Sequence, residues 1–343
     1  MIFLNTLDAK KLILTPEYNF LRENKHLNNN IILLGLGGSH SYGTNVEGSD
    51  VDIRGIAANT KKEILLGKDF EQVIDNTTDT VIYSLKKIIG LLSDGNPNVL
   101  EIIFQKPEDF IIMTDIGKKL VDNKEIFLSK KCFYSFGGYA RQQLSRLENK
   151  SMRELPQEKQ EIHILNSVKN AKDSFKEKFF EFEDDDIKLY VDDSQREDMV
   201  TEIFMDINLK HYPLRDYKCM WSEMHNIVKD YGKLGKRAKN AILHDKINKH
   251  AMHLVRLMLC GVEILEFGTF STYMGKHLDL LMDIRNGKFM ASDGQMNDEF
   301  FKMVNNLENR LNIAFTKTDL PDKPDKEKVE NLLYSINEKI VLG

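Results

Sequence analysis

Two aspartates, Asp50 and Asp52, are separated by one residue in a segment predicted to be a β-strand. Residues two apart on a strand point to the same face, so the two carboxylates are expected to project side by side. Neighbouring carboxylates repel unless a cation lies between them, and oxygen-only ligands suit Mg²⁺. An isolated Asp-x-Asp is more often a polar turn. The pair therefore becomes informative only together with the residues that precede it.

The segment before this pair combines a predicted buried strand with a glycine-rich turn. Ile31–Leu36 is a short apolar run, typical of a buried strand, and Gly37, Gly38 and Ser39 follow it. Backbone N–H groups at a glycine-rich turn that opens a helix can hold phosphate. Glycine pairs occur in any tight turn, so this turn alone is weak evidence. Followed by the spaced aspartates, it predicts a site for a metal ion and a nucleoside triphosphate.

The combined motif resembles that of the DNA polymerase β nucleotidyltransferase superfamily, in which a strand and Gly-Ser precede a spaced Asp-x-Asp. It is closest to one branch, the predicted nucleotidyltransferases of bacteria and phages similar to the YcgL and RNA-ligase-associated (RlaP) proteins. The blocks that carry this resemblance are Ser39-His40-Ser41-Tyr42-Gly43, Ser49-Asp50-Val51-Asp52-Ile53-Arg54-Gly55, Asp79, Leu85-Lys86-Lys87 and Asn96-Pro97-Asn98-Val99-Leu100-Glu101. Weaker similarity returns at His250–Leu257 and Leu280–Gly287.

The resemblance implies an α+β fold, with a polymerase-β-like core of mixed sheet and flanking helices, followed by a mostly helical domain. We expect a catalytic domain over residues 1–125 and a helical domain over residues 126–343 that closes the cleft, with an acidic insertion near 180–197. The implied reaction transfers a nucleoside monophosphate from a nucleoside triphosphate to a hydroxyl group and releases pyrophosphate. Two Mg²⁺ ions, or Mn²⁺, would serve as cofactors. ATP is the expected donor by abundance, and protein side chains, RNA ends and small molecules stay open as acceptors.

Asp50, Asp52 and Asp79 are the predicted catalytic and metal-binding acids. Asp79 stands at the start of the third predicted strand, where the family pattern also has an acid, and could accept the proton of the attacking hydroxyl. Its alternative role is that of a turn residue. Glu101 competes for the third position but could equally cap or support a turn, and Glu71 is a more distant choice.

Gly38 and Ser39 are expected to hold the β- and γ-phosphates. Lys87, which follows the third predicted strand, has a counterpart in the family and is a further phosphate ligand. Arg54 follows the aspartates at the next position on the same strand face. It could contact phosphate or pair with Asp52, and the sequence does not separate these roles.

A set of cationic residues in the second half recurs at three- and four-residue intervals, which places it on one helix face. Its members are Lys246, Lys249, His250, His253 and Arg256. We predict that Lys249, His253 and Arg256 bind nucleotide by forming a roof over the phosphates, whereas the alternative is a solvated basic face. Tyr139, Arg141 and Gln142 could line a nucleotide pocket, although helix packing is their more common use.

Strands are predicted over residues 31–36, 50–58 and 80–83, and helices over residues 85–92 and 251–267. Two more helices are expected over 139–147 and 162–180, followed by an acidic hairpin insertion. A rival interpretation is a catalytically silent module that binds nucleotide or nucleic acid. Three acids at the family's positions argue against it, because a binding module does not need a two-metal site.

The composition is that of an ordinary globular protein. Of the 343 residues, 41% are hydrophobic and 29% charged, and the net charge of −5 argues against a dedicated nucleic-acid coat. Three cysteines, Cys132, Cys219 and Cys260, are too few and too widely spaced for a disulfide framework. The N-terminus does not resemble a signal peptide, and no apolar run approaches the roughly 20 residues of a membrane helix. We therefore expect a cytoplasmic protein that has no membrane partner.

Overall fold

The computed structural model describes residues 6–140, 144, 162, 165, 175, 178–193, 201–228, 245–292 and 296–343, and the fold is given for these. By their contacts the residues form two compact units, each described by itself. The first unit comprises residues 1–144, 251–289 and 297–343, and the second comprises residues 145–250 and 290–296. The domain boundary expected after residue 125 stays a prediction.

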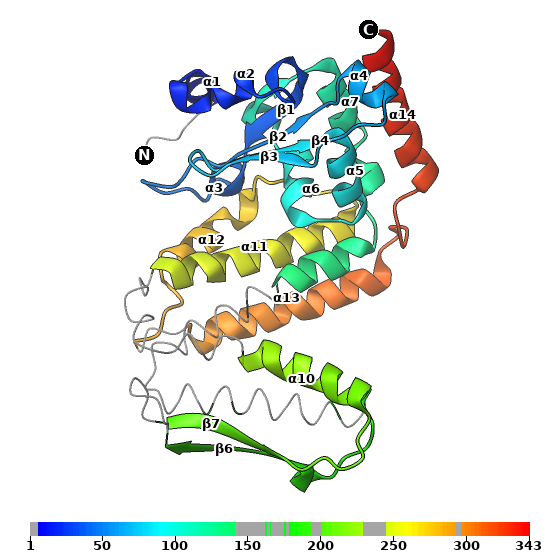
Figure 1. The fold of residues 1–343 in the computed structure, drawn as a ribbon. Helices are drawn as coiled ribbons and strands as arrows, with labels where there is room; N and C mark the ends of the chain where they lie inside the picture. The colour runs from blue at the N-terminus through cyan, green and yellow to red at the C-terminus, as the bar shows by residue number, and fades with distance from the viewer. Residues whose placement is uncertain are drawn as a thin grey trace. The chain divides into compact units, whose positions relative to one another are not determined.

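A five-stranded mixed sheet forms the centre of the first unit (Figure 1). Its strand order is β3-β4-β2-β1-β5, in which β2 and β4 are parallel and the other neighbours antiparallel. The strands are β1 (Ile31–Leu36), β2 (Ile53–Ala57), β3 (Gln72–Asp75), β4 (Thr80–Ser84) and β5 (Phe110–Met113). Every residue of β1 is buried, as its apolar run predicts.

Helices flank this sheet and make up most of the rest of the first unit. Those of its first part are α1 (Thr6–Leu12), α2 (Phe20–Glu23), α3 (Gly38–Tyr42), α4 (Lys61–Leu65), α5 (Leu85–Ser93), α6 (Pro97–Ile103) and α7 (Asp115–Asp122), and residues 131–140 are also helical. The later helices are α11 (Asp245–Phe267), whose residues from Ala251 on belong to this unit, α12 (Leu278–Arg285), α13 (Asp298–Lys317) and α14 (Lys326–Leu342). Short 3₁₀ helices are η1 (Pro16–Tyr18), η2 (Asn28–Asn30), η3 (Pro107–Asp109), η4 (Lys124–Phe127), η5 (Asp184–Asp186) and η8 (Gly275–His277). Helix α14 packs against α4, α5 and α7, so the C-terminus returns to the sheet (Figure 1). The predicted α+β class, a mixed sheet followed by a helical region, is confirmed.

One face of the sheet packs against the N-terminal segment. The buried cluster on this face consists of Ala9, Ile13, Tyr18, Leu21, Leu27, Ile31, Leu34, Leu36, Ile53, Ala57, Ile82 and Ile111. Side chains alternate along a strand, so the neighbours of Ile53 on β2 and Ile82 on β4 point the other way. Arg54 and Tyr83 therefore share the opposite face.

The start of β2 differs from the prediction. The strand expected over residues 50–58 begins only at Ile53, so the placement of Asp50 and Asp52 within it is wrong. Strand β1 ends at Leu36, opposite Ile53, and the chain then turns into α3. Asp50 and Asp52, which precede Ile53, therefore have no partner strand on the β1 side. A single hydrogen bond extends the pairing, from the Gly37 N–H to the Asp52 carbonyl oxygen (2.8 Å).

Local capping explains where two helices near the sheet begin. The Ser84 hydroxyl accepts a hydrogen bond from the Lys87 N–H (3.1 Å), which caps α5. Asn96 and Pro97, which follow the helix predicted over residues 85–92, open helix α6. There the Asn96 side chain caps the helix and Pro97 takes the first helical position, where its missing N–H costs nothing. Helix α6 carries Glu101, which is therefore a helical residue.

The second unit contains a two-stranded antiparallel sheet. Strand β6 (Ile187–Asp193) pairs with β7 (Thr201–Ile207), and helix α10 (Leu214–Val228) follows. The buried residues of this unit include Phe175, Met220 and Met224. The acidic run forms η5 directly before β6, and its role as an insertion stays a prediction. The helices predicted over 139–147 and 162–180 fall largely outside the described residues.

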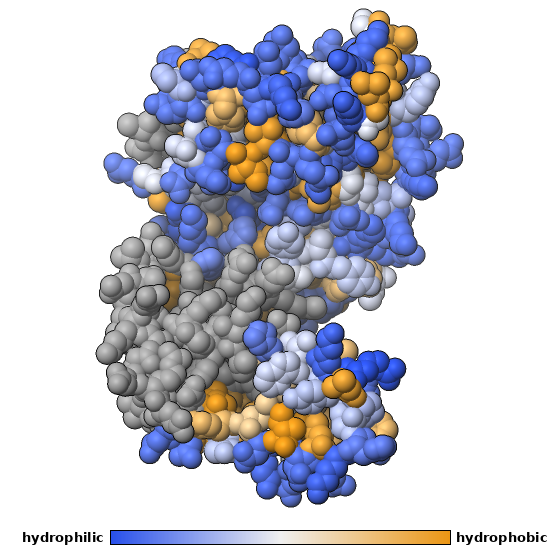
Figure 2. Space-filling view, viewed as in Figure 1, coloured by the Kyte–Doolittle hydropathy of each residue, from blue (hydrophilic) through white to orange (hydrophobic). Residues whose placement is uncertain are grey.

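The visible surface is mostly hydrophilic, with small apolar patches between the polar side chains (Figure 2). Within the described ranges, each helix is too short or too polar to cross a bilayer.

Asp109 provides a test of the fold through pH. It is buried, its Oδ2 has no hydrogen-bond partner among the described residues, and Lys106 Nζ lies 4.0 Å from Oδ1. Burial raises the pKa of Asp109 from 3.8 to about 6, although Lys106 opposes the rise. Between pH 3.8 and about 6, Asp109 is therefore protonated in the folded state but ionised in the unfolded state. The contribution of Asp109 to the stability of the fold falls as the pH rises through this range.

We expect Asp109→Asn to gain stability relative to wild type as the pH rises from 4 to 7, by about 3 kcal/mol at most. Urea unfolding of both proteins at several pH values measures the difference. Asp122→Asn, which removes an exposed carboxylate of α7, should show no such trend. A constant difference between Asp109→Asn and wild type across this range would contradict the buried-carboxyl interpretation.

Candidate active site

The carboxylate of Asp52 lies directly against the turn that opens α3. Gly38 has a positive φ (+55°), and a Cβ placed there would overlap Asp52 Oδ2. A Cβ at Gly37 would in turn approach Arg54 Cγ to 2.8 Å. Both glycines are thus needed for close packing of the turn on the residues before and within β2. Ser39 follows in the first turn of α3 and is half-buried.

Arg54 links Asp52 to Asp79. Because β2 and β4 are parallel with Ile53 opposite Thr80, the two acids occupy equivalent positions, each one residue before its strand. Arg54 Nη2 lies 2.9 Å from Asp52 Oδ1 and 3.1 Å from Asp79 Oδ1. Arg54 Nη1 also donates to the Asp79 carbonyl oxygen. Asp52 and Asp79 thus lie close together at the start of the parallel pair, and their catalytic and metal-binding roles stay predictions.

This pair of acids has the chemistry of a cation site. Its donors are carboxylate oxygens, which suit divalent ions such as Mg²⁺, and a guanidinium already bridges them. Asp50 is exposed two residues before Asp52 and could add a further oxygen. Among the described residues no three His, Cys, Asp or Glu side chains are arranged as a metal-binding group. The residues fit a divalent cation in donor type, with Arg54 competing for the same oxygens.

A buried cluster around Tyr42 adjoins these acids. Tyr42 is the last residue of α3, and its hydroxyl forms a hydrogen bond with Glu101 of α6. The guanidinium carbon of Arg256 lies 3.6 Å from the Tyr42 ring centroid. Burial raises the pKa of Glu101, the positive charges of Arg256 and Arg54 oppose the rise, and the negative charge of Asp52 adds to it. Glu101 is therefore electrostatically coupled to both arginines.

Tyr83 is a further residue of this face that the motif does not reveal. Burial raises the pKa of its hydroxyl, while the charges of Arg54 and Lys87 oppose the rise and those of Glu101 and Tyr139 add to it. Its side chain thus lies among the charged groups of the site. Alternation with the buried residue before it on β4 is the pattern that could have placed it there.

The structure gives the surroundings of some of the remaining predicted ligands, and the others fall outside the described part. Lys87 pairs with Glu71 (Nζ to Oε2, 2.5 Å). Arg256 is buried rather than part of a solvated face, and its Nη2 lies 2.7 Å from His253 Nδ1. Lys249 is exposed. The side chain of Lys246 and residues Arg141 and Gln142 fall outside what the structure describes. The nucleotide-binding roles of Lys87, Lys249, His253 and Arg256 stay predictions.

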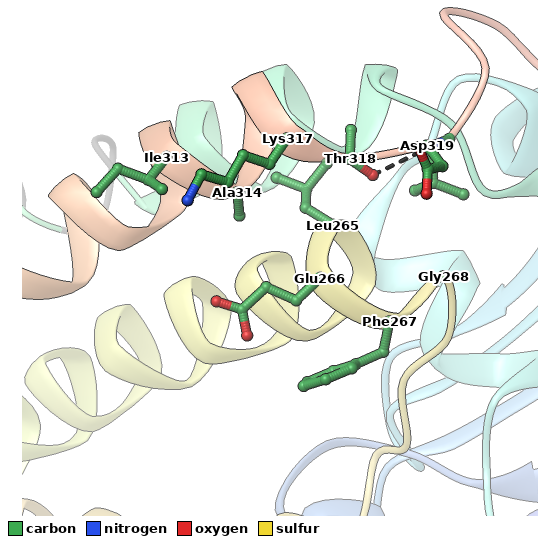
Figure 3. Close-up of a pocket in the computed structure, with 10 residues that line it drawn as sticks. Leu265, Glu266, Phe267, Gly268, Ile313, Ala314, Lys317, Thr318 and Asp319 are labelled. Atoms are coloured by element: carbon green, nitrogen blue, oxygen red, sulfur yellow. Dashed lines mark hydrogen bonds between the residues drawn. The ribbon is translucent and has the colours of Figure 1, made fainter.

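A surface pocket of about 530 Å³ lies elsewhere, between the C-terminal ends of α11 and α13 (Figure 3). Its lining residues are Leu265, Glu266, Phe267, Gly268, Ile313, Ala314, Lys317, Thr318, Asp319 and Leu320. Glu266 forms a two-point contact with Arg310, at 2.7 and 2.6 Å. None of the predicted site residues lines this pocket.

Comparison with known proteins agrees with the motif. Residues 17–172 match the RNA repair pathway DNA polymerase beta family (RlaP). An uncharacterized 38.9 kDa protein from the nrdC-mobD intergenic region of Enterobacteria phage T4 is 33% identical over 129 residues. That alignment covers 34% of this chain and 38% of the phage protein, so the chain spans little more than a third of this relative. No solved structure matches the chain.

The family match covers β1 to β5 and all three predicted acids, and it ends before α11. The weaker similarities at His250–Leu257 and Leu280–Gly287 therefore stay predictions. A polymerase beta family suggests nucleotidyltransferase activity in general, and enzymes of this kind generally use divalent metals. The resemblance that the Gly-Ser turn and spaced aspartates predict is confirmed as a similarity: residues 17–172 match the model of the RNA repair pathway DNA polymerase beta family.

Proposed function

We propose that the protein transfers a nucleoside monophosphate from a nucleoside triphosphate to a hydroxyl group and releases pyrophosphate. One observation carries this proposal: the Asp52 carboxylate lies against the turn that opens α3, and Arg54 joins it to Asp79. Oxygen donors for a cation thus lie beside backbone N–H groups that suit phosphate. A metal–triphosphate substrate requires both kinds of group in one place.

The predicted acids and the turn that opens α3 have different roles in this proposal. Asp50, Asp52 and Asp79 would hold Mg²⁺, with Mn²⁺ as an alternative. When bound, such ions stabilise the attacking and leaving oxygens of an in-line displacement. Gly38 and Ser39 would orient the β- and γ-phosphates through their N–H groups. Asp79, whose side chain is 57% exposed, would accept the proton of the incoming hydroxyl.

The donor and the acceptor follow from weaker arguments. ATP is the expected donor by abundance. The name of the matching family refers to an RNA repair pathway, and this favours an RNA end as the acceptor. Protein side chains and small molecules are the alternative acceptors, because this fold supports many of them.

The test offers the full chain each α-labelled nucleoside triphosphate with Mg²⁺ and RNA whose 3′ hydroxyl is free or blocked. Label in the free-hydroxyl RNA, with an equal amount of pyrophosphate, supports the proposal and the acceptor. Pyrophosphate release without labelled RNA would support the activity and direct the search to another acceptor. Triphosphate binding without any pyrophosphate would instead indicate a nucleotide-binding module that lacks catalysis.

Substitution of Gly38 tests the close packing at the α3 turn. Gly38→Ala is expected to lower transfer at least about tenfold and to destabilise the fold, because the added Cβ would displace Asp52 at a strained backbone position. Steady-state transfer rates and thermal unfolding measure the two effects.

Gly67→Ala is the matched control, because Gly67 also has a positive φ (+64°) but open space around its Cβ position. It shares the backbone strain and should keep normal transfer. Equal transfer rates in the two variants would show that contact between the turn and Asp52 is unimportant.

A further inference from the structure

Arg256 is a buried cation that forms no ion pair with any described residue. It lies on α11 and is 6% exposed, and its Nε is buried without a hydrogen-bond partner in the described part of the chain. Arg54 and Arg310, by contrast, each pair with a carboxylate. Burying a cation without a counter-ion is strongly unfavourable, so an anion is expected to complete this position.

Two neighbours hold the guanidinium of Arg256 in one orientation. Its central carbon lies 3.6 Å from the centroid of the Tyr42 ring, a stacking contact that suits a planar guanidinium better than a lysine ammonium. Its Nη2 lies 2.7 Å from His253 Nδ1, and because an arginine only donates, Nη2 donates to this ring nitrogen. Neither an aromatic ring nor a neutral imidazole cancels the charge of Arg256.

Glu101 compensates this charge only in part. Burial raises the pKa of Glu101 and the charge of Arg256 opposes the rise, but no ion pair joins the two side chains. The Glu101 carboxylate instead accepts a hydrogen bond from the Tyr42 hydroxyl. Arg256 therefore keeps donor capacity for a further anion.

The position of Arg256 in the fold indicates which anion this is. Its guanidinium stacks on Tyr42, the last residue of α3, and the turn that opens α3 lies against the Asp52 carboxylate. Tyr42 follows Gly38 by four residues, which is about 6 Å along a helix axis. Guanidinium groups match the oxygens of a phosphate, and the substrates of the proposed reaction carry phosphates.

We propose that Arg256, held by Tyr42 and oriented by His253, forms a buried binding site for a phosphate group of a substrate. The identity of this ligand rests on the proposed function, because either the triphosphate or the RNA acceptor could supply the phosphate. The helix-face pattern predicted a roof of several cations, whereas this site depends on one buried guanidinium. Tyr42 and His253 are its positioning residues.

The test measures binding without divalent metal, so it does not depend on transfer. The probes are tripolyphosphate, a non-hydrolysable nucleoside triphosphate, and a short RNA with or without a terminal phosphate. Arg256→Met should bind the first two about tenfold to a hundredfold more weakly than wild type, because a charge-assisted contact is lost. A loss confined to the phosphorylated RNA would support the site and identify the acceptor as the source of the phosphate. Equal affinity of wild type and Arg256→Met for every probe, or no binding by wild type, would overturn the inference.

Thermal unfolding separates this site from a purely structural role. Arg256→Met loses the stacking contact but no longer buries a charge, so its unfolding temperature should stay within about 4 °C of wild type. Tripolyphosphate should raise the unfolding temperature of wild type and not that of the variant. A large fall in unfolding temperature with unchanged tripolyphosphate binding by the folded fraction would overturn the inference. If Arg256→Met does not fold, Arg256→Lys decides: it keeps the charge but not the planar fork, and should bind tripolyphosphate at least about threefold more weakly. Equal affinity of Arg256→Lys and wild type would overturn the stacked guanidinium site.

Arg310→Met is the matched control, because it removes an arginine that is already paired, at 2.6 Å from Glu266. Its affinity for tripolyphosphate should equal that of wild type. The two proposals of function and phosphate site fail separately. Weaker binding by Arg256→Met without pyrophosphate release by wild type overturns the proposed function alone. Pyrophosphate release by wild type with unchanged binding by Arg256→Met overturns the phosphate site alone.

Discussion

Replacement of Asp52 by asparagine is expected to lower nucleotidyl transfer about a hundredfold to a thousandfold while the fold stays intact. The substitution preserves shape and removes the negative charge that attracts a divalent cation. The Asp52 backbone carbonyl accepts the hydrogen bond from Gly37, so that contact survives. The Arg54 ion pair is partly exposed, and its loss should cost at most about 1 kcal/mol. Transfer from an α-labelled triphosphate and thermal unfolding measure the two effects.

Asp122→Asn is the matched control for this substitution, since Asp122 pairs with Lys118 on the surface of α7 (2.8 Å). It should leave transfer unchanged. Asp50→Asn should resemble Asp52→Asn if both acids bind the metal. Triphosphate should still bind Asp52→Asn weakly, because the N–H groups of the α3 turn do not depend on the carboxylate. Transfer within about tenfold of wild type, with Mg²⁺ present, would contradict the metal site.

The part of the site that is local in sequence could be predicted from it. The apolar run of β1, the glycines of the α3 turn and the spacing to Asp52 all lie within about 20 residues. The position of Asp79 also follows, because it directly precedes a β-branched and aromatic strand. The exact start of β2 could not be predicted, because it depends on where β1 ends opposite it. The first residue of β2 is determined by its backbone pairing with β1 and not by the pattern of its side chains.

The Tyr42–Glu101–Arg256 cluster could not be predicted from spacing. Its members come from α3, α6 and α11, so their contact depends on tertiary packing. Helical spacing placed Arg256 with other cations on one face, and such a face is usually solvated. The structure buries Arg256 against an aromatic ring instead. Periodicity reports which residues share a face and does not report which other element covers that face.

Asp79→Asn is expected to lower transfer by about a hundredfold with little change in triphosphate affinity. Asparagine is preferred to alanine here, because Asp79 has a positive φ (+45°) that asparagine tolerates. The substitution thus separates loss of the carboxylate from backbone strain. Asp79 lies beside Asp52 across the parallel strand pair, and both contact Arg54. A fall in kcat without a rise in the dissociation constant of the triphosphate is the expected observation.

Glu101 is the alternative candidate for the third acid. Its surroundings indicate that its substitution should lower stability and not activity, in contrast to substitution of Asp79. Glu101 is 8% exposed and bonded to Tyr42, so Glu101→Ala would leave the buried Tyr42 hydroxyl without its partner. We expect this change to cost about 1–3 kcal/mol of stability while the folded fraction stays active. An acceptor hydroxyl must also reach the acid that takes its proton, and Asp79 is far more accessible. If Glu101→Ala is well folded and inactive while Asp79→Asn is active, Glu101 is the third acid and the assignment of Asp79 is wrong.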